Sequence, residues 1–254
     1  MTELTHRTTG PGRARDCYDL VADVVAAPQH FPTHLHAEIL RHDGGRDLVE
    51  RWVLDQGSVR GWRFWRELDE PGLRIVFEHH EPRPPLLRMR GVWTFREQGP
   101  DTLIEVRHAF ALADGDATAR FAADLDRKVP LQLAHIAGLA GDLGHRRRRT
   151  VRREEAQVVP GTCESVYERI VADEADDGTS ARVHLPPHGI VAKQHSGLAP
   201  DIEALTGEYR LAEDPGGVRV TIRRTATATT VAAVASVGER LEEDLRRRFA
   251  ALAR

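Results

Sequence analysis

Residues 102–108 read TLIEVRH, and residues 218–224 read VRVTIRR, an offset of 116 positions. The same offset relates GVWTF at 91–95 to GEYRL at 207–211. Self-similarity at a fixed spacing is the signature of duplicated units. The sequence therefore predicts two related copies of one fold.

The second copy is shorter than the first. Tyr18 and Tyr167 are 149 positions apart, whereas His80 and His195 are only 115 apart, so 34 residues are missing from the second copy. In the first copy this gap covers about 26–56, a helical corner and two strands. We expect an incomplete second sheet, in which a pocket built from the missing strands cannot form.

Each copy has the pattern of an α+β fold, in which an antiparallel meander is closed by a long helix. Turns that carry Gly, Pro and Asp separate the apolar runs. We expect strands at 3–9, 36–41, 47–54, 58–68, 73–80, 91–97 and 102–112, and helices at 16–25, 117–143 and 231–253. A curved sheet wrapped on one helix leaves a cavity suited to an apolar or elongated molecule.

The predicted domains are residues 1–144, an Arg-rich linker at 145–156 and a shortened second domain at 157–254. The linker begins HRRRRTVRR. A basic run can bind nucleic acid, but acidic residues follow at once and no aromatic platform is interleaved. We interpret it as a solvent-exposed helix end.

Composition indicates a soluble, cytoplasmic protein of 254 residues. Hydrophobic residues make up 41% and charged residues 30%, which suits an ordinary buried core. No membrane-spanning run or secretory leader is present. Cys17 and Cys163 are expected to be free thiols, and a net charge of −3 gives no general reason to bind nucleic acid.

The segment most informative about chemistry is GSVRGWRFWRELD at 57–69. Strand alternation puts Trp62, Phe64, Arg66 and Leu68 on one face, with Arg63, Trp65 and Glu67 on the other. Arg66 has two interpretations. It either pairs with a nearby carboxylate, or it is a fixed cation that polarises a carbonyl or holds an enolate inside an apolar cavity.

The sequence resembles bacterial aromatic polyketide aromatase/cyclases of the two-domain type, in the START-like (SRPBCC, helix-grip) superfamily. The segments that carry the resemblance, in family order, are YDLVAD (18–23), FPT (31–33), HAE (36–38), LD (68–69), RI (74–75), GVW (91–93) and VRHAF (106–110), with IVAKQ (190–194) and TGEY (206–209) in the second copy. The resemblance implies a helix-grip fold, duplicated, with a shortened second copy.

The resemblance also implies a function in antibiotic or pigment biosynthesis. A poly-β-ketone tethered to an acyl carrier protein would undergo first-ring aldol cyclisation, dehydration and aromatisation in the cavity. The family's functional arginine maps onto Arg66 and a tryptophan onto Trp62. Phe64 replaces a hydroxyl residue, and Ala27 replaces a tryptophan, which puts the family's proton shuttle in doubt. A family tyrosine falls near His34, or His36 after a shift of one residue.

Dehydration needs a weak acid or base, and histidine is the natural choice near neutral pH. The candidates are His34, His36, His80 and His108, although a histidine at such a position is more often structural or on the surface. His108 shares a strand face with Ile104, Val106 and Phe110. The predicted catalytic residues are Arg66, His34 and His108. The predicted substrate-binding residues are Trp62, Phe64, His36, His80, Trp93, Val106 and Phe110.

A cupin-like metal site is an alternative, because His30, His34, His36 and Glu38 are ligand types at short spacing. Their intervals match no metal motif, and we expect no metal or cofactor. The sequence also shows neither a phosphate-binding loop nor a recognisable Ser or Cys nucleophile.

Three hypotheses follow. In the first, the first copy folds and cyclises the substrate, while the second serves packing, homodimerisation or docking of the carrier protein and other polyketide synthase components. In the second, the protein is a non-catalytic module that holds or chaperones a hydrophobic intermediate. In the third, it is a cyclase that acts on a later ring.

Overall fold

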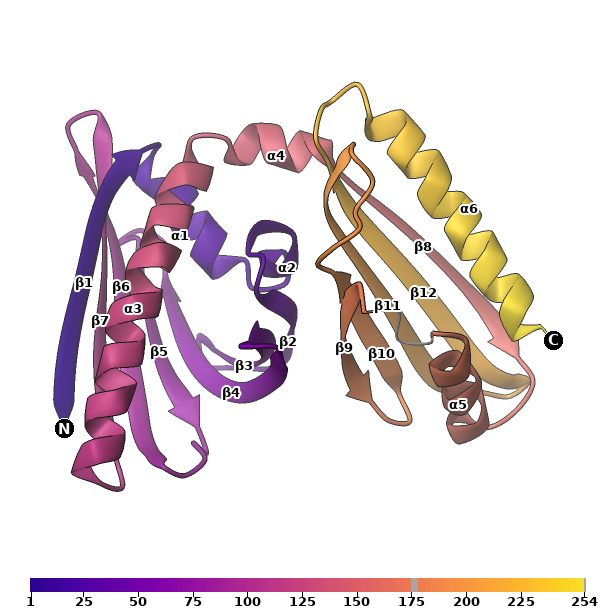
Figure 1. Ribbon diagram of the computed structural model, residues 1–254, viewed down its shortest axis with the longest axis horizontal. Helices are drawn as coiled ribbons and strands as arrows, with labels where there is room; N and C mark the ends of the chain where they lie inside the picture. Colours follow the sequence, from indigo (N-terminus) through magenta and orange to yellow (C-terminus); the bar gives the residue numbers. More distant parts are fainter. Residues whose placement is uncertain (175–177, 254) are drawn as a thin grey trace. The chain divides into compact units, whose positions relative to one another are not determined.

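The computed structural model describes residues 1–174 and 178–253, which form two compact units (Figure 1). The first unit comprises Met1–Ala27, Ala37–Arg51 and Gly61–Gly144. The second unit comprises Pro28–His36, Trp52–Arg60 and His145–Arg254. Two segments from the expected first domain therefore pack with the second unit.

The N-terminal sheet is antiparallel where its register is defined, and among the described residues it has seven strands in the order β1-β7-β6-β5-β4-β3-β2. Its strands are β1 (Thr2–Pro11), β2 (His34–Asp43), β3 (Arg46–Asp55), β4 (Ser58–Asp69), β5 (Arg74–His80), β6 (Leu86–Gln98) and β7 (Asp101–Leu112). This confirms the expected meander, with β1 returning to pair with the last strand.

Four helices of the described chain precede β8: α1 (Ala14–Ala22), α2 (Ala27–His30), α3 (Gly115–Ala140) and α4 (Leu143–Arg149). The side chain of Asp114 caps α3 by accepting a hydrogen bond from the amide of Ala117, which satisfies a donor that the first helical turn leaves free. Figure 1 shows α3 lying along β1 and β7, and Phe121 of α3 meets Phe110 of β7 edge to face. The long closing helix is thus confirmed.

The C-terminal sheet is also antiparallel, and the described residues form five strands in the order β8-β12-β11-β10-β9. These are β8 (Thr150–Val159), β9 (Ser180–Leu185), β10 (Gly189–Gln194), β11 (Ile202–Asp214) and β12 (Gly217–Ala228), with helices α5 (Cys163–Asp173) and α6 (Val234–Leu252). Figure 1 shows α6 along β8 and β12. The order matches the first sheet without counterparts of β2 and β3, as the 34-residue deficit predicted.

The Arg-rich segment differs from the exposed linker that we expected. Its first residues belong to α4, and β8 begins at Thr150 and pairs with β12. Arg146 and Arg149 both contact the carboxylate of Glu203, and Arg149 also donates to the carbonyl oxygen of Ala228 at 2.6 Å. The Arg149 side chain is only 6% exposed. These partners draw the end of the basic run into the second unit.

An apolar cluster explains why early segments of the chain belong to the second unit. Leu35 of β2, with Trp52 and Leu54 of β3, packs against apolar residues of β9 and β10, which are Ala181, Val183, Leu185 and Val191. The amide of Gln29 bonds the hydroxyls of Thr206 and Thr227. Burial of this apolar area stabilises the arrangement.

Cys17 and Cys163 are both free and buried, as the sequence predicted. Burial raises the pKa of the Cys17 thiol to about 11, so it stays protonated. Among the described helices, none combines the length and apolar character that a membrane crossing would require.

The closing helix α3 provides a test of the core. Leu133 is fully buried, whereas Leu131 on the same helix is 68% exposed. We expect Leu133→Ala to lower the free energy of unfolding by about 2–5 kcal/mol, because it leaves a cavity. The matched control Leu131→Ala should change it by less than about 0.5 kcal/mol. Urea denaturation measures both, and equal effects would contradict this packing.

Candidate functional site

The face of β4 that we predicted to point inward does so. Phe64 belongs to an apolar cluster of the first unit, packed with Val24, Ala37 and Val49 and flanked by Ile39, Trp62 and Phe77. In the register with β5, Phe64 lies opposite His79 and Arg66 opposite Phe77. These residues form one continuous surface, which we call the inner face of the first unit.

Arg66 lies on this face and is only 5% exposed. Its Nη2 and Nε atoms lie 2.9 and 3.2 Å from Oδ2 of Asp47 in β3, and Nη1 donates to the carbonyl oxygen of Ala22 at the end of α1. Of the two interpretations of Arg66, the ion pair with a nearby carboxylate is the one the structure shows. Its charge is therefore already compensated by the protein.

A second arginine on the inner face was missed by sequence reasoning. Asp47, Val49 and Arg51 alternate along β3, so all three side chains share the inward direction. The Arg51 guanidinium carbon lies 5.0 Å above the centroid of the Phe64 ring. Alternation from Asp47 was the signal that could have found it.

Arg51 differs from Arg66 in its partners. Within the described residues it forms no ion pair, and its Nε atom is buried without a hydrogen-bond partner. Burial lowers the pKa of Arg51 to about 10, and the nearby Arg66 adds to this effect. At neutral pH it remains a cation, and no carboxylate among the described residues compensates its charge.

Two histidines complete the inner face. The ring of His79 stacks on Trp62 at a centroid distance of 6.0 Å, and His108 meets the edge of Phe77 at 5.8 Å. Burial lowers the pKa of each to about 4, helped by Arg51 for His79 and by His6 for His108. Both imidazoles are therefore neutral at physiological pH, and Nδ1 of His108 has no hydrogen-bond partner among the described residues.

Space for these rings depends on a glycine. Gly91 of β6 pairs with both Phe77 and His108 in the sheet. A Cβ atom at Gly91 would lie 2.3 Å from the Phe77 ring. Glycine is therefore required for Phe77 to lie flat across β6 toward His108.

His80 was predicted to bind substrate, but it lies on the opposite face of the sheet. It pairs with Arg63, and its ring packs against Trp65, 6.1 Å between centroids. The neighbouring His79 occupies the inward position. The inward histidine thus differs from the expected one by a single residue, because successive side chains of a strand point to opposite faces.

His34 was predicted to be catalytic and His36 to bind substrate, and both residues belong to the second unit. The carbonyl oxygen of His34 accepts a hydrogen bond from Nζ of Lys193 at 3.0 Å, and the His34 ring packs on Phe31. The His36 ring lies 5.4 Å from that of Trp52. These contacts all lie within the second unit.

The remaining predicted substrate-binding residues are core residues. Val106 and Phe110 of β7 are completely buried, and Phe110 packs against α3. Trp93 is also buried and stacks on Phe95. Trp93, Val106 and Phe110 thus belong to the buried core of the first unit.

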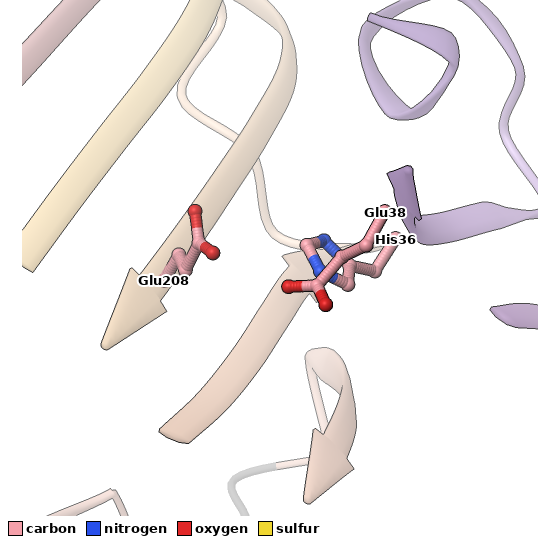
Figure 2. Close-up of side chains that lie close together, drawn as sticks. All are labelled: His36, Glu38 and Glu208. Atoms are coloured by element: carbon pink, nitrogen blue, oxygen red, sulfur yellow. The ribbon is translucent and has the colours of Figure 1, made fainter. Parts of the chain in front are cut away.

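Among the described residues, one group includes a residue of the metal site that we considered as an alternative. Figure 2 shows His36 and Glu208 of β11, whose ligand atoms lie within 4.8 Å of one another. Glu38, which is also labelled, belongs to the first unit. The Glu208 carboxylate already contacts Arg223 at 2.9 Å and Arg210. A carboxylate held by two guanidiniums is a poor ligand for a cation, and His30 and His34 are not part of this group.

The inner face thus combines an uncompensated guanidinium with two neutral imidazoles in apolar surroundings. A guanidinium in such surroundings stabilises an oxyanion strongly, because little water screens it. A neutral imidazole can accept a proton or donate one. The arrangement suits reactions in which negative charge develops on a carbonyl oxygen.

The comparisons of sequence match about half of the chain. A family model described as "Polyketide cyclase / dehydrase and lipid transport" matches residues 11–137. The actinorhodin polyketide synthase bifunctional cyclase/dehydratase of Streptomyces coelicolor is 34% identical over 136 residues, covering 54% of this chain and 42% of that protein. The granaticin counterpart of Streptomyces violaceoruber is 35% identical over 143 residues, covering 55% and 44%. This chain thus spans less than half the length of these relatives.

Two crystal structures share the fold. The di-domain aromatase/cyclase StfQ from the steffimycin pathway has a TM-score of 0.73 and 26% identity, covering 98% of this chain and 95% of that one. BexL from the BE-7585A pathway has a TM-score of 0.74 and 21% identity, covering 100% and 96%. The duplicated helix-grip fold is therefore confirmed. Because the family model matches half of its residues, the chain belongs to the polyketide cyclase/dehydrase and lipid transport family.

Proposed function

We infer that the first unit is a polyketide cyclase/dehydratase, which closes and dehydrates a ring in a carrier-protein-bound poly-β-ketone. The observation that carries this proposal is the uncompensated Arg51 guanidinium beside neutral His79 on an apolar inner face. Membership of the family and similarity to cyclase/dehydratases of polyketide synthases support it. An acyl carrier protein and other synthase components are the corresponding partners.

Ring closure begins when a base removes a proton from a methylene between two carbonyls. The enolate carbon attacks a second carbonyl carbon, a C–C bond forms, and the resulting alkoxide is protonated. Arg51 is placed to stabilise the enolate and alkoxide oxygens, and His79 to accept and return the proton. The apolar surface brings the two carbons together.

Dehydration then removes the hydroxyl group and a neighbouring proton as water, leaving a C=C bond. No oxidant or reductant is needed. A neutral imidazole can take the carbon-bound proton and supply one to the departing hydroxide. His108, whose Nδ1 lacks a partner among the described residues, is the second candidate for this transfer.

Arg66 has a different role in this proposal. Its ion pair with Asp47 and its bond to Ala22 hold β3 and β4 against α1. Arg66 therefore acts as a positioning residue for Arg51, because Arg51 follows Asp47 by four residues on β3. The same ion pair favours the alternative of a non-catalytic carrier. Asp47 neutralises Arg66, which is the position onto which the family's functional arginine maps.

The first test removes the charge of Arg51. We expect Arg51→Met to lower kcat/KM for ring closure by about 10²–10³-fold, as loss of one oxyanion donor does. The control Arg63→Met, on the outer face of β4, should stay within twofold. Product formation from a carrier-bound chain is followed by mass spectrometry, with circular dichroism to check folding. Wild-type rates for Arg51→Met would favour the carrier alternative.

The second test separates positioning from catalysis. Arg66→Met should lower the free energy of unfolding by about 3 kcal/mol, because it removes the buried partner of the Asp47 carboxylate and leaves only the contact with His42. Adding Asp47→Asn should recover part of this loss. A double-mutant cycle in urea measures the coupling, and a coupling near zero would show that the ion pair does not hold these strands together.

The third test concerns pH. The folded-state pKa of about 4 for His79 and His108 lies below the unfolded value near 6.5. Between these pH values the unfolded chain binds more protons than the folded chain. The free energy of unfolding should therefore fall as the pH drops from about 6.5 toward 4. NMR of the imidazole protons should show neither ring titrating between pH 5.5 and 8. A midpoint near 6.5 for either would contradict its burial.

A further inference from the structure

A third histidine lies between the sheet of the first unit and its closing helix. His6 of β1 is the register partner of the fully buried Val106 of β7. On the same face of β1, Gly10 lies so close to α3 that a Cβ atom there would be 2.5 Å from Cβ of Ala137. The His6 side chain therefore points from the sheet toward α3, and it is only 10% exposed.

A carboxylate of α3 holds the His6 ring. Nε2 of His6 lies 2.9 Å from Oδ1 of Asp126. An ionised carboxylate only accepts hydrogen bonds, so in the neutral ring the proton is on Nε2 and Nδ1 carries a lone pair. This Nδ1 atom is buried and has no hydrogen-bond partner in the part of the chain that the structure describes. Buried polar atoms are rarely left unpaired, so the lone pair points to a group that a ligand supplies.

The ring of His108 lies beside that of His6. Their centroids are 6.3 Å apart and their planes are inclined by 64°. Nδ1 of His108 is also buried without a partner among the described residues. Two adjacent rings thus each keep one nitrogen unpaired in apolar surroundings. A hydroxyl group suits such a pair, because it can donate one hydrogen bond and accept another.

His6 differs from the other two histidines in how it can hold a proton. Burial lowers the pKa of His79 and of His108 to about 4, and no carboxylate contributes to either shift. These two rings are therefore weak bases. At His6, by contrast, Asp126 compensates the positive charge that the ring gains with a proton, as the aspartate of a Ser-His-Asp triad does.

We propose that His6 is the catalytic base of the dehydration step, with Asp126 as its positioning residue and His108 as the residue that binds the departing hydroxyl group. This inference rests on the function proposed above and divides its two steps between two places in the first unit. Arg51 and His79 serve ring closure, whereas His6 and His108 serve the loss of water.

The step is balanced without a further reactant. Nδ1 of His6 takes the proton of the carbon between the carbonyl and the hydroxyl-bearing carbon, and the electron pair of that C–H bond forms an enolate. As the enolate collapses, a C=C bond forms and the C–O bond breaks. The departing hydroxide takes the proton back from Nδ1 and leaves as water, so His6 is neutral again.

The first experiment follows both steps in His6→Gln with a carrier-bound poly-β-ketone. Chromatography with mass spectrometry separates the linear chain, the ring-closed alcohol of equal mass and the dehydrated product. Dehydration should slow by about 10²-fold, as loss of a general base does, and the alcohol should accumulate, while ring closure stays within twofold. Dehydration at the wild-type rate, or an equal loss of both steps, would overturn the proposal.

The matched control for His6→Gln is His188→Gln, an exposed histidine in the turn between β9 and β10. It should leave both steps unchanged. If the wild-type protein closes no ring, the proposed function itself fails. If the wild type closes and dehydrates the ring and His6→Gln does the same, only the role of His6 fails.

The second experiment tests the tautomer of His6 without substrate. NMR of the ¹⁵N-labelled full chain at about pH 8 should show the proton of this ring on Nε2. In Asp126→Asn the Nδ1-protonated form should also appear, because an amide can donate as well as accept. A wild-type ring protonated on Nδ1 would contradict the proposal, since no lone pair would then be available there.

Asp126→Asn also replaces His6→Gln if the latter fails to fold by circular dichroism, because the Asp126 side chain is 60% exposed. It should slow dehydration at least tenfold and leave KM within twofold. The control is Asp124→Asn, since Asp124 lies on the same helix and contacts Arg127 and Lys128. Equal dehydration rates in the two variants would show that Asp126 does not position the base.

Discussion

One buried ion pair fixes the geometry of the first unit. The Arg66 guanidinium joins β4 to Asp47 in β3 and to the last turn of α1 through Ala22. Because Asp47 neutralises Arg66, a carboxylate is no longer available to Arg51 on the same strand face. The pairing of one arginine thus leaves the other with an unbalanced charge in apolar surroundings, where a charge acts most strongly.

The two sheets share their backbone arrangement and differ in the side chains that they carry. Strand order, the closing helix and the glycines at 91 and 207 are common to both. In the first unit the inner face is aromatic, with neutral imidazoles at His79 and His108. In the second, the position equivalent to His108 is Arg224, which forms an ion pair with Asp244. A duplication has preserved the backbone while the side-chain chemistry has diverged.

Much of this fold could be predicted from the sequence, because strand alternation and repeat spacing are local or periodic signals. The strands were placed within about two residues, except β6, which begins five residues before the expected 91. The inward direction of Trp62, Phe64 and Arg66 also followed from alternation. His79 was mistaken for His80, because a strand carrying adjacent histidines gives no local sign of which one points inward.

Other features depend on contacts between distant residues and could not be predicted. Which arginine is compensated depends on where Asp47 lies in space, not on spacing along the chain. In the same way, Arg149 seemed part of an exposed basic run until Glu203 and the Ala228 carbonyl were brought beside it. Pairing of charges is settled by tertiary structure.

The packing of residues 28–36 and 52–60 in the second unit has a consequence for how such a protein can evolve. Leu35, Trp52 and Leu54 are encoded in the first half of the gene, yet their apolar partners lie in β9 and β10. A gene split near codon 144 would produce a first half in which these leucine and tryptophan side chains lose their apolar partners and are exposed to solvent. These contacts therefore favour keeping both halves in one polypeptide chain.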